Sequence, residues 1–501
     1  MKTKSLLLIL FLLLSAGAPA QGQEAAPSPS PEPALTPLPV PSPSFREQTE
    51  PGPEVSRAPL HLTLEEAINV TLQRNRGIED SIDNVTSSRY TLIAADADYE
   101  VKIAPAGSAA IEGGSGIETD DGESFGIQFS KKFATGTSIY ITPKVIRTEE
   151  AYETGVTSYL VQPLLRGLSV EYNLSGIRAA EFGERTSLRS LYLTQVSTMV
   201  TTVQNIYNLI RDREILRLNE ESARRLEGHK EAAQVKEKIG IASPIDVYRA
   251  EIELNQALEN LTVAREAYGD SIDSLKLLLA LPMETNLEIT APWDYKLLEL
   301  DEKQAIEVAL NNRVEIIQAE DDVSEAERSS RVAKQNTLPE LNLELSYRRY
   351  GEDEKFYRSA DFDKDKWGVG LSAEGDIWRT AEKAQYQQSL LTVKGTRRRM
   401  VNLRDEIQSE VKQELRTLMK SAKSIEIQKD QIHQAEGKLE LARIKFSHGL
   451  ANNFDLIEAE RELLQAQSRL LGAVTNYIVS SYRLKAALGT LLEKPQEWRV
   501  S

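Results

Sequence analysis

The segment around Gly240 occurs twice in this chain, and this repeat limits the folds that the chain can adopt. Gly240-Ile-Ala-Ser-Pro-Ile-Asp246 returns 209 residues later as Gly449-Leu-Ala-Asn-Asn-Phe-Asp455. The same offset aligns further pairs without a gap: Lys236 with Lys445, Gln256 with Gln465, Tyr268 with Tyr477, and Leu275 with Leu484. A repeat of this length indicates a fold that is built from two equivalent halves.

A second pair of matching segments shows where each half begins. Ala67-Ile68 and Leu72 return as Ala305-Ile306 and Leu310, now at an offset of 238. The offsets of 238 and 209 differ by 29, so the first half holds about 29 extra residues. We therefore expect a first repeat over 61–290, a second repeat over 291–492, and a short C-terminal tail over 493–501.

The residues before the first repeat have the pattern of a targeting segment and a linker. Lys2 and Lys4, a short apolar run and Ala18-Pro19-Ala20 predict a secretory signal peptide over 1–20. Residues 21–60 are rich in proline, serine and glutamate, which favours an extended linker without a core. We therefore expect the mature protein to leave the cytoplasm.

Charge and cysteine content exclude several classes of partner and chemistry. The net charge of −16 and the pI of about 5.1 argue against nucleic acid as the main partner. The chain has no cysteine, which excludes disulfides, thiolate metal sites and a thioether lipid anchor. The four histidines lack metal-ligand spacing, and no nucleophile stands beside a base. We expect no enzyme activity, no metal and no cofactor.

Long stretches with heptad-like apolar spacing predict long helices. A helix over about 173–238 would be roughly 100 Å long at 1.5 Å per residue. Pro244 stands in the first turn of a return helix that reaches about 281, where proline is tolerated. Further helices are expected at roughly 63–101, 302–335, 380–447 and 453–491. Antiparallel rods that turn at Gly240 and Gly449 predict coiled-coil hairpins.

Between the helices, apolar and polar residues alternate with a period of two. This pattern is typical of membrane-barrel strands, although any one segment also fits a half-exposed strand of a soluble sheet. The expected strand regions are about 104–164 and 339–377, with an extra hairpin at about Ser124 to Ile146 that either joins the barrel wall or caps it. The alternating apolar residues are Phe125, Ile127, Phe129, Ile139, Ile141, Leu341, Leu343, Leu345, Tyr347, Trp367, Val369 and Leu371.

A closure argument then predicts an oligomer. Open sheet edges are not tolerated in lipid, because each unpaired backbone group costs several kcal/mol. Two strands in each half give about four per chain, whereas the smallest closed bacterial barrels have ~8. The predicted fold is mostly α with β: long coiled-coil hairpins that form an α-barrel, plus a trimeric transmembrane β-barrel, in a tandem repeat.

Several of these segments together resemble the TolC family of outer-membrane efflux proteins. The resemblance rests on the duplicated Gly-(x)5-Asp turns, on Gln162-Pro-Leu-Leu-Arg-Gly167 and on Ala486-Ala-Leu-Gly-Thr-Leu491. It implies a homotrimer with a 12-stranded barrel in outer-membrane lipid and a helical tube in the periplasm. It also implies a passive exit duct for drug efflux or type I secretion that works with a periplasmic adaptor protein and an inner-membrane pump.

The resemblance also assigns roles to residues at the hairpin ends. Asp455 and Glu458, with Asp246 at the equivalent place in the first half, are expected to ring the periplasmic aperture and to favour cations. Stabilisation of a helix N-terminus by the same carboxylates is the alternative. The turns are expected to contact the adaptor through four residues, Gly240, Pro244, Gly449 and Asn453. Phe446 and Ala451 stand where the family has its aromatic hydroxyl and arginine, so the latch of the family is expected to be absent.

Two other classes of protein remain as alternatives. A periplasmic adaptor also carries a long helical hairpin, but it has one hairpin between split β-domains rather than two in direct repeat. A secreted structural coiled coil would explain the helices without the alternating strands.

Overall fold

The computed structural model describes residues 59–495, except 115–116, 149, 241–242, 296–299, 449 and 452, and without the side chains of 110–121. These residues belong to the unit Val55–Ser501, which is described by itself. The predicted signal peptide and nearly all of the predicted linker lie outside the described residues.

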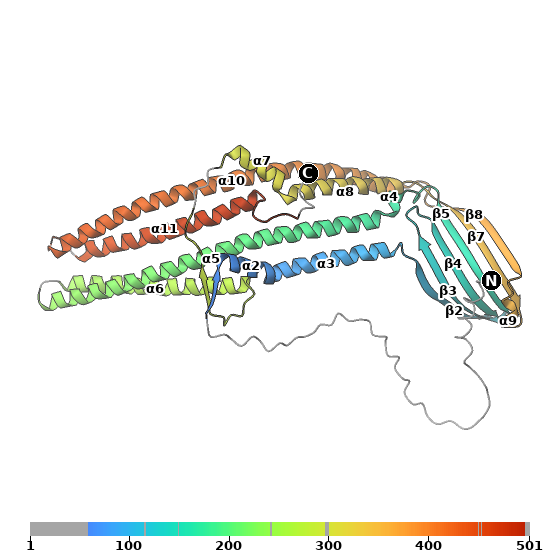
Figure 1. Ribbon diagram of the computed structural model, residues 1–501, viewed down its shortest axis with the longest axis horizontal. Coiled ribbons are helices and arrows are strands. Elements are labelled where there is room, and N and C mark those ends of the chain that lie inside the picture. The colour runs from blue at the N-terminus through green and yellow to red at the C-terminus, as the bar shows by residue number, and fades with distance from the viewer. Residues whose placement is uncertain are drawn as a thin grey trace, which may run out of the picture. The chain divides into compact units, whose positions relative to one another are not determined.

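Helices make up most of this unit, and they lie side by side with a β-sheet at one end (Figure 1). The helices are α2 (Leu64–Arg74), α3 (Arg76–Ala97), α4 (Val170–Asn173), α5 (Ser175–Lys238), α6 (Pro244–Leu278), α7 (Glu302–Asn312), α8 (Val314–Asn336), α9 (Phe356–Ser359), α10 (Thr380–Ser447) and α11 (Asn453–Ala487). The long rods α5 and α10 confirm the predicted rods, and the return helices α6 and α11 end three or four residues before the predicted bounds.

The prediction was wrong for two of the helices, because each is divided into two shorter helices. The helix expected over 63–101 divides at Asn75, and the one expected over 302–335 divides at Arg313. Both residues have extended backbone angles, with φ and ψ of −66° and 124° at Asn75 and of −70° and 125° at Arg313. The Asn75 side chain accepts hydrogen bonds from the amides of Gly77 and Ile78, which caps the second helix.

The two breaks are equivalent in the repeat and make equivalent contacts. Asn75 Nδ2 donates to the carbonyl of Leu278 at the end of α6 (3.0 Å), and Arg313 Nη1 donates to the carbonyl of Ala487 at the end of α11 (3.3 Å). Asn75 and Arg313 are separated by the offset of 238, and Leu278 and Ala487 by the offset of 209. Each half thus uses a side chain at its helix break to satisfy a carbonyl at the end of its return helix.

The strands form one antiparallel sheet of six with the order β2-β3-β4-β5-β7-β8. They are β2 (Lys102–Gly114), β3 (Ile117–Lys132), β4 (Ser138–Thr148), β5 (Tyr152–Pro163), β7 (Glu340–Asp353) and β8 (Lys364–Glu374). The expectation of about four strands per chain was therefore too low. The hairpin predicted near 124–146 is β3–β4, and it pairs within the same sheet on both of its sides.

A short parallel pair of strands joins the two ends of the first repeat near the middle of the helices. β1 (Leu60–Thr63) pairs with β6 (Leu287–Thr290), and Thr63 then caps α2 in a capping box with Glu66. Leu287 and Ile289 are buried in the central core. The pair fixes the start of the first repeat beside its end, directly before the second repeat begins.

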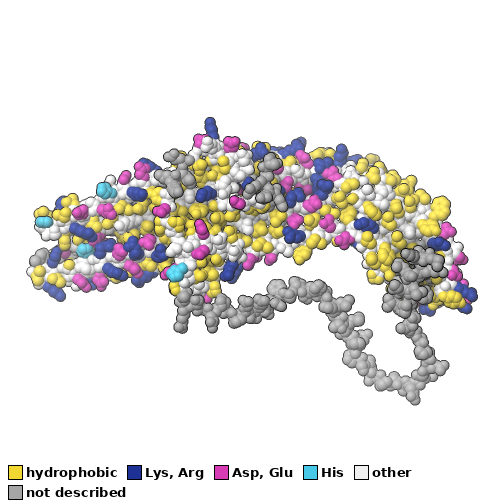
Figure 2. All heavy atoms as spheres, in the orientation of Figure 1, with side chains coloured by type: hydrophobic (Ala, Val, Ile, Leu, Met, Phe, Trp, Pro, Cys, Tyr) yellow, Lys and Arg dark blue, Asp and Glu magenta, His cyan; other side chains and the backbone are white. Residues whose placement is uncertain are grey.

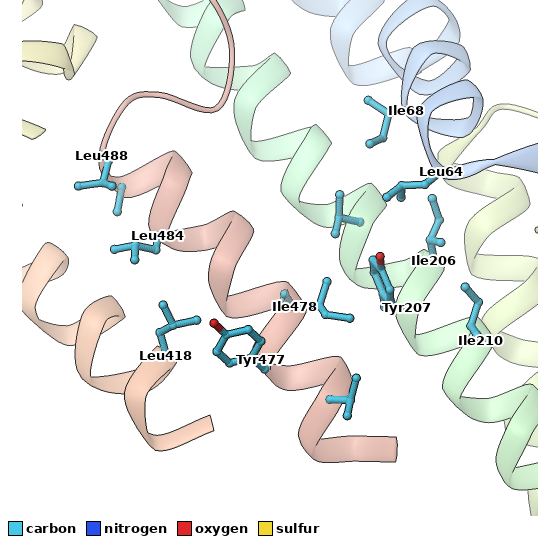
Figure 3. Packing of buried hydrophobic residues seen from close by; sticks show 14 of the residues in the cluster. Leu64, Ile68, Ile206, Tyr207, Ile210, Leu418, Tyr477, Ile478, Leu484 and Leu488 are labelled. Atoms are coloured by element: carbon cyan, nitrogen blue, oxygen red, sulfur yellow. The ribbon is translucent and has the colours of Figure 1, made fainter. Parts of the chain in front are cut away.

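The largest apolar core lies where α2, α5, α10 and α11 meet (Figure 3). Leu64 and Ile68 of α2, Ile206 and Ile210 of α5, and Tyr477 and Leu484 of α11 belong to this cluster. Tyr207 also lies there; its hydroxyl donates to the carbonyl of Pro292 (2.9 Å), and burial raises the pKa of Tyr207 to about 12. Long helices are stabilised mainly by such lateral packing of an apolar face.

We expect that Ile206→Ala will lower the free energy of unfolding by about 2–5 kcal/mol, because Ile206 is fully buried and the truncation leaves a cavity. The same change at Ile82, which is half exposed on α3, should cost much less. Thermal unfolding of both purified variants measures the difference. Equal losses would show that the cluster around Ile206 does not stabilise the fold.

Candidate functional site: the hairpin ends and the strand sheet

The first candidate site lies at the ends of the two helical hairpins, α5–α6 and α10–α11, which turn at the same end of the unit and away from the sheet (Figure 1). Gly240 follows α5 with a φ of +76°, a conformation that favours glycine, and no atom lies within 4 Å of the place of a side chain. Pro244 begins α6, as the sequence predicts. The position of Gly240 is therefore open to its surroundings.

Asp246 has a structural role at the start of α6. Its carboxylate accepts a hydrogen bond from the amide of Ser243 (3.1 Å), and the Ser243 side chain accepts one from the amide of Ile245 (3.1 Å). This is a capping box, which satisfies amides that the helix leaves unpaired. Asp246 therefore caps the start of α6, and its expected part in an aperture stays a prediction.

The second hairpin presents Asp455 and Glu458 in the first turns of α11, which begins at Asn453. Asp455 is exposed, whereas Glu458 is half-buried and lies 4.0 Å from Lys438 Nζ of α10. Gly449, the equivalent of Gly240, lies outside the described residues. Of the two carboxylates, Asp455 is thus the more open to water.

A cation–π contact joins the two hairpin ends. Lys236 Nζ of α5 lies 4.1 Å from the centre of the Phe446 ring of α10. Phe446 stands where the family latch has its aromatic hydroxyl, and here its ring contacts a cation instead.

A buried carboxylate, Glu460 of α11, makes a second connection between the hairpins. Its side chain is 8% exposed, and its Oε2 lies 3.3 Å from His229 Nε2 and 3.8 Å from Arg225 Nε, both of α5. Its Oε1 accepts a hydrogen bond from Arg443 of α10 (3.4 Å). Three basic side chains from two helices therefore surround one carboxylate, and we name these four residues the Glu460 cluster.

The sequence analysis missed the Glu460 cluster, although a signal for it exists. Glu460 lies three residues after Ile457 and four after Leu456, which places a charge on the apolar face of α11. Ile457 packs against Ala223 and Leu226 of α5 and against α6. A charge at such a spacing is stable only with partners across the interface. Burial raises the pKa of Glu460, but His229, Arg225 and Arg443 outweigh burial and hold it below its ordinary value.

The second candidate site is the sheet, which has one apolar and one polar face. Residues that are paired from strand to strand form a row across the sheet, and one such row consists of Ile103, Phe129, Ile141, Ser158, Tyr347 and Trp367. The next row on the same face consists of Lys131, Ile139, Leu160, Leu345 and Val369. Many of these side chains are exposed, including Trp367 at 73% and Val369 at 63%. Figure 2 shows hydrophobic side chains gathered over the strands at this end of the unit.

The opposite face of the same strands is polar and internally hydrogen-bonded. Glu344 of β7 accepts a hydrogen bond from the Tyr159 hydroxyl of β5 (2.5 Å) and another from the Ser372 hydroxyl of β8 (2.6 Å). Arg348 pairs with Glu153 on the same face. A sheet that is apolar on one face and polar on the other fits a boundary between lipid and water.

Among the described helices, none combines the length and the hydropathy that crossing a membrane requires.

Comparisons with known proteins agree with this architecture. The sequence model of the family described as "Outer membrane efflux protein" matches residues 305–490. The probable efflux pump outer membrane protein TtgC of Pseudomonas putida is 21% identical over 85% of this chain and 82% of its own length. Outer membrane protein TolC of Escherichia coli is 23% identical over 51% of this chain and 54% of its own length.

Solved structures share the fold over most of its length. The CmeC outer membrane channel of Campylobacter jejuni superposes with a TM-score of 0.68 at 15% identity, and covers 86% of each chain. The MtrE outer membrane channel of Neisseria gonorrhoeae, in an open state, gives a TM-score of 0.67 at 17% identity over 85% of this chain and 89% of that one.

The two-faced sheet and the paired hairpins, together with these matches, define an outer-membrane efflux protein. The chain resembles the TolC family over most of its length. Its helical hairpins extend from the outer membrane into the periplasm.

We expect that Glu460→Gln will loosen the contact between the hairpins, because it removes the charge that three basic side chains surround. The loss should be about 1–3 kcal/mol, in the range of hydrogen bonds to charged groups. Hydrogen–deuterium exchange of α5 near Arg225 and His229 measures the local opening. The matched control is Glu462→Gln, which affects an exposed pair with Lys438 inside one hairpin and should cost at most about 1 kcal/mol.

The contribution of Glu460 should depend on pH in a defined direction. Because the folded pKa lies below the ordinary value of 4.5, the stabilisation is fully present above about pH 4.5 and is lost as the pH falls through the folded pKa. The difference in α5 exchange between wild type and Glu460→Gln should therefore shrink as the pH falls below 4.5. A difference that grows below pH 4.5 would contradict this assignment.

Proposed function

We propose that three copies of this protein form the outer-membrane exit duct of a tripartite efflux or type I secretion system. The observation that carries the proposal is a single antiparallel sheet, apolar on one face, that is joined at one end to long helical hairpins. Six strands are too few to close a barrel alone, since the smallest bacterial barrels have ~8. Symmetric association of copies supplies the missing strands.

The four helices next to the sheet support a tube as well as a barrel. At that end α3 packs on α5, α5 on α8, and α8 on α10. Three copies would place twelve such helices around a water-filled interior, as in a coiled-coil cylinder. The duct is passive: it is no enzyme, holds no cofactor, and takes its energy from an inner-membrane pump.

We assign the hairpin ends to the contact with the rest of the machine. A periplasmic adaptor protein would bind the turns at Gly240, Pro244, Gly449 and Asn453, because these turns lie farthest from the sheet. TtgC, a relative of similar length, is described as an efflux pump outer membrane protein, which supports the efflux role.

In the trimer, Asp455 and Glu458 would face the narrow end of the tube as a ring of six carboxylates. Such a ring favours cations and repels anions. Asp246 contributes less to this ring, because its carboxylate is held by the Ser243 amide.

The proposal predicts a cation-selective pore. Purified protein from the outer-membrane fraction should run as a heat-modifiable trimer and should conduct ions in planar bilayers. Asp455→Asn combined with Glu458→Gln should lower the cation-to-anion permeability ratio several-fold. Glu266→Gln combined with Asp270→Asn removes the same charge from exposed positions farther along α6, and should leave the ratio near that of wild type.

The outcomes separate the two parts of the proposal. An unchanged permeability ratio in the Asp455 and Glu458 double variant would contradict the proposed ring of carboxylates, but not the proposed duct. A monomer without conductance would contradict the duct itself.

A further inference from the structure

We infer that each copy contributes six strands to the membrane barrel, so that three copies close an 18-stranded wall that is as wide as the helical tube below it. The inference rests on the proposed trimeric duct and deepens it. It departs from the 12 strands that the resemblance implies, because the β3–β4 hairpin is part of the wall.

The first argument is that β3–β4 continues the two-faced pattern of the sheet. Phe129 of β3 and Ile141 of β4 are opposite each other, and the same row reaches Tyr347 and Trp367 in the second half. A hairpin that capped the barrel from outside would have no need of this register. Its apolar face lies in the same surface as that of β7 and β8.

The second argument is that the periplasmic turn of this hairpin is built into the junction between sheet and helix. The side chain of Asn173, at the end of α4, donates to the carbonyls of Ala134 (3.2 Å) and Gly167 (2.7 Å). Gly136 has a φ of +85°, and a Cβ there would lie 2.4 Å from the Gly167 carbonyl oxygen. The turn therefore fits against the start of the long helix and leaves no room for a side chain.

The third argument compares the order of helices and strands. The helices pack in the order α3, α5, α8, α10, and the strands joined to them follow the same order, β2, β5, β7, β8. The β3–β4 hairpin enters this sequence between β2 and β5, opposite the α3–α5 pair. The order of the helices around the axis therefore matches the order of the strands that are joined to them.

The fourth argument is that the width of six strands matches the width of the four helices. Strands about 4.8 Å apart and tilted by about 40° each occupy roughly 6 Å of circumference, so six strands span about 38 Å. Four helices packed about 8–10 Å apart span about 32–40 Å. Four strands would span only about 25 Å, and the wall would have to narrow sharply above the helices.

The unpaired edges of the sheet identify the partner as a second copy of this chain. In the described sheet β2 and β8 are the outer strands, and six alternating strands leave them antiparallel to each other. The β8 edge of one copy can therefore pair with the β2 edge of the next copy, and the antiparallel pairing of the sheet continues across the contact. A wall of 18 strands encloses a water-filled channel of the kind found in 16–18-stranded porins.

Lipid exposure tests whether β3–β4 lies in the wall. Because the chain has no cysteine, single cysteines can carry a fluorescent label at Ile141 or Tyr140 in the hairpin, with Leu345 or Ser346 of β7 as matched controls. In vesicles, we expect nitroxide-labelled lipid to quench the Ile141→Cys and Leu345→Cys labels to within twofold of each other. Aqueous iodide should preferentially quench the Tyr140→Cys and Ser346→Cys labels.

The possible outcomes are distinct. If the β7 labels alternate between lipid and water but both hairpin labels are in water, the 18-stranded wall is wrong and the duct remains. If the β7 labels do not alternate either, the proposed membrane barrel fails as a whole.

Disulfide formation tests the edge pairing. We combine Ile103→Cys of β2 with Trp367→Cys, Val369→Cys or Leu371→Cys of β8, all on the same face, and expect one combination to yield covalent trimers under oxidation. The control replaces Ile103→Cys by Ile139→Cys in β4, which is flanked by β3 and β5 and should yield none. No trimer from any of the three, or equal yields from the control, would overturn the inference.

Discussion

The lateral packing of helices around the central core is the interaction on which the rest of this structure depends. α5 and α10 are 64 and 68 residues long. Helices in proteins are stabilised mainly by packing of an apolar face against other elements, and less by their intrinsic helix propensity. In the core, side chains of α2, α5, α10 and α11 meet in one cluster, together with Leu287 and Ile289 of β6. This cluster fixes the distance and the direction of both hairpins, which in turn place the sheet at one end and the turns at the other.

The hairpin ends have weaker connections than the centre. Beyond the core the two hairpins meet through small apolar clusters, the Glu460 cluster and the Lys236–Phe446 contact. Surface-exposed charges contribute little, whereas a carboxylate that is 8% exposed and surrounded by three basic groups depends strongly on its partners. The hairpin ends are therefore held together by fewer buried apolar residues than the centre.

The two halves of the repeat have the same architecture but differ in how they achieve it. Asn75 and Arg313 stand at equivalent breaks and satisfy equivalent carbonyls, one with an amide and the other with a guanidinium that also pairs with Glu315 and Glu410. The greater difference lies in the sheet, where the first half contributes four strands and the second contributes two. The residues that lengthen the first half therefore widen the sheet instead of forming a separate loop.

The sequence by itself determined the duplication, the long rods and the two-faced strands, because each produces a repeating pattern of residue types along the chain. The turn at Gly240, the proline that begins α6 and the capping boxes at Thr63 and Ser243 are local in the same sense. Only the tertiary structure decided the helix breaks at Asn75 and Arg313, since their side chains bond to carbonyls 203 and 174 residues away. It also decided that Glu460 lies between three basic groups. Contacts between residues so far apart in the chain depend on how the two halves pack. Such packing produces no periodic pattern in the sequence.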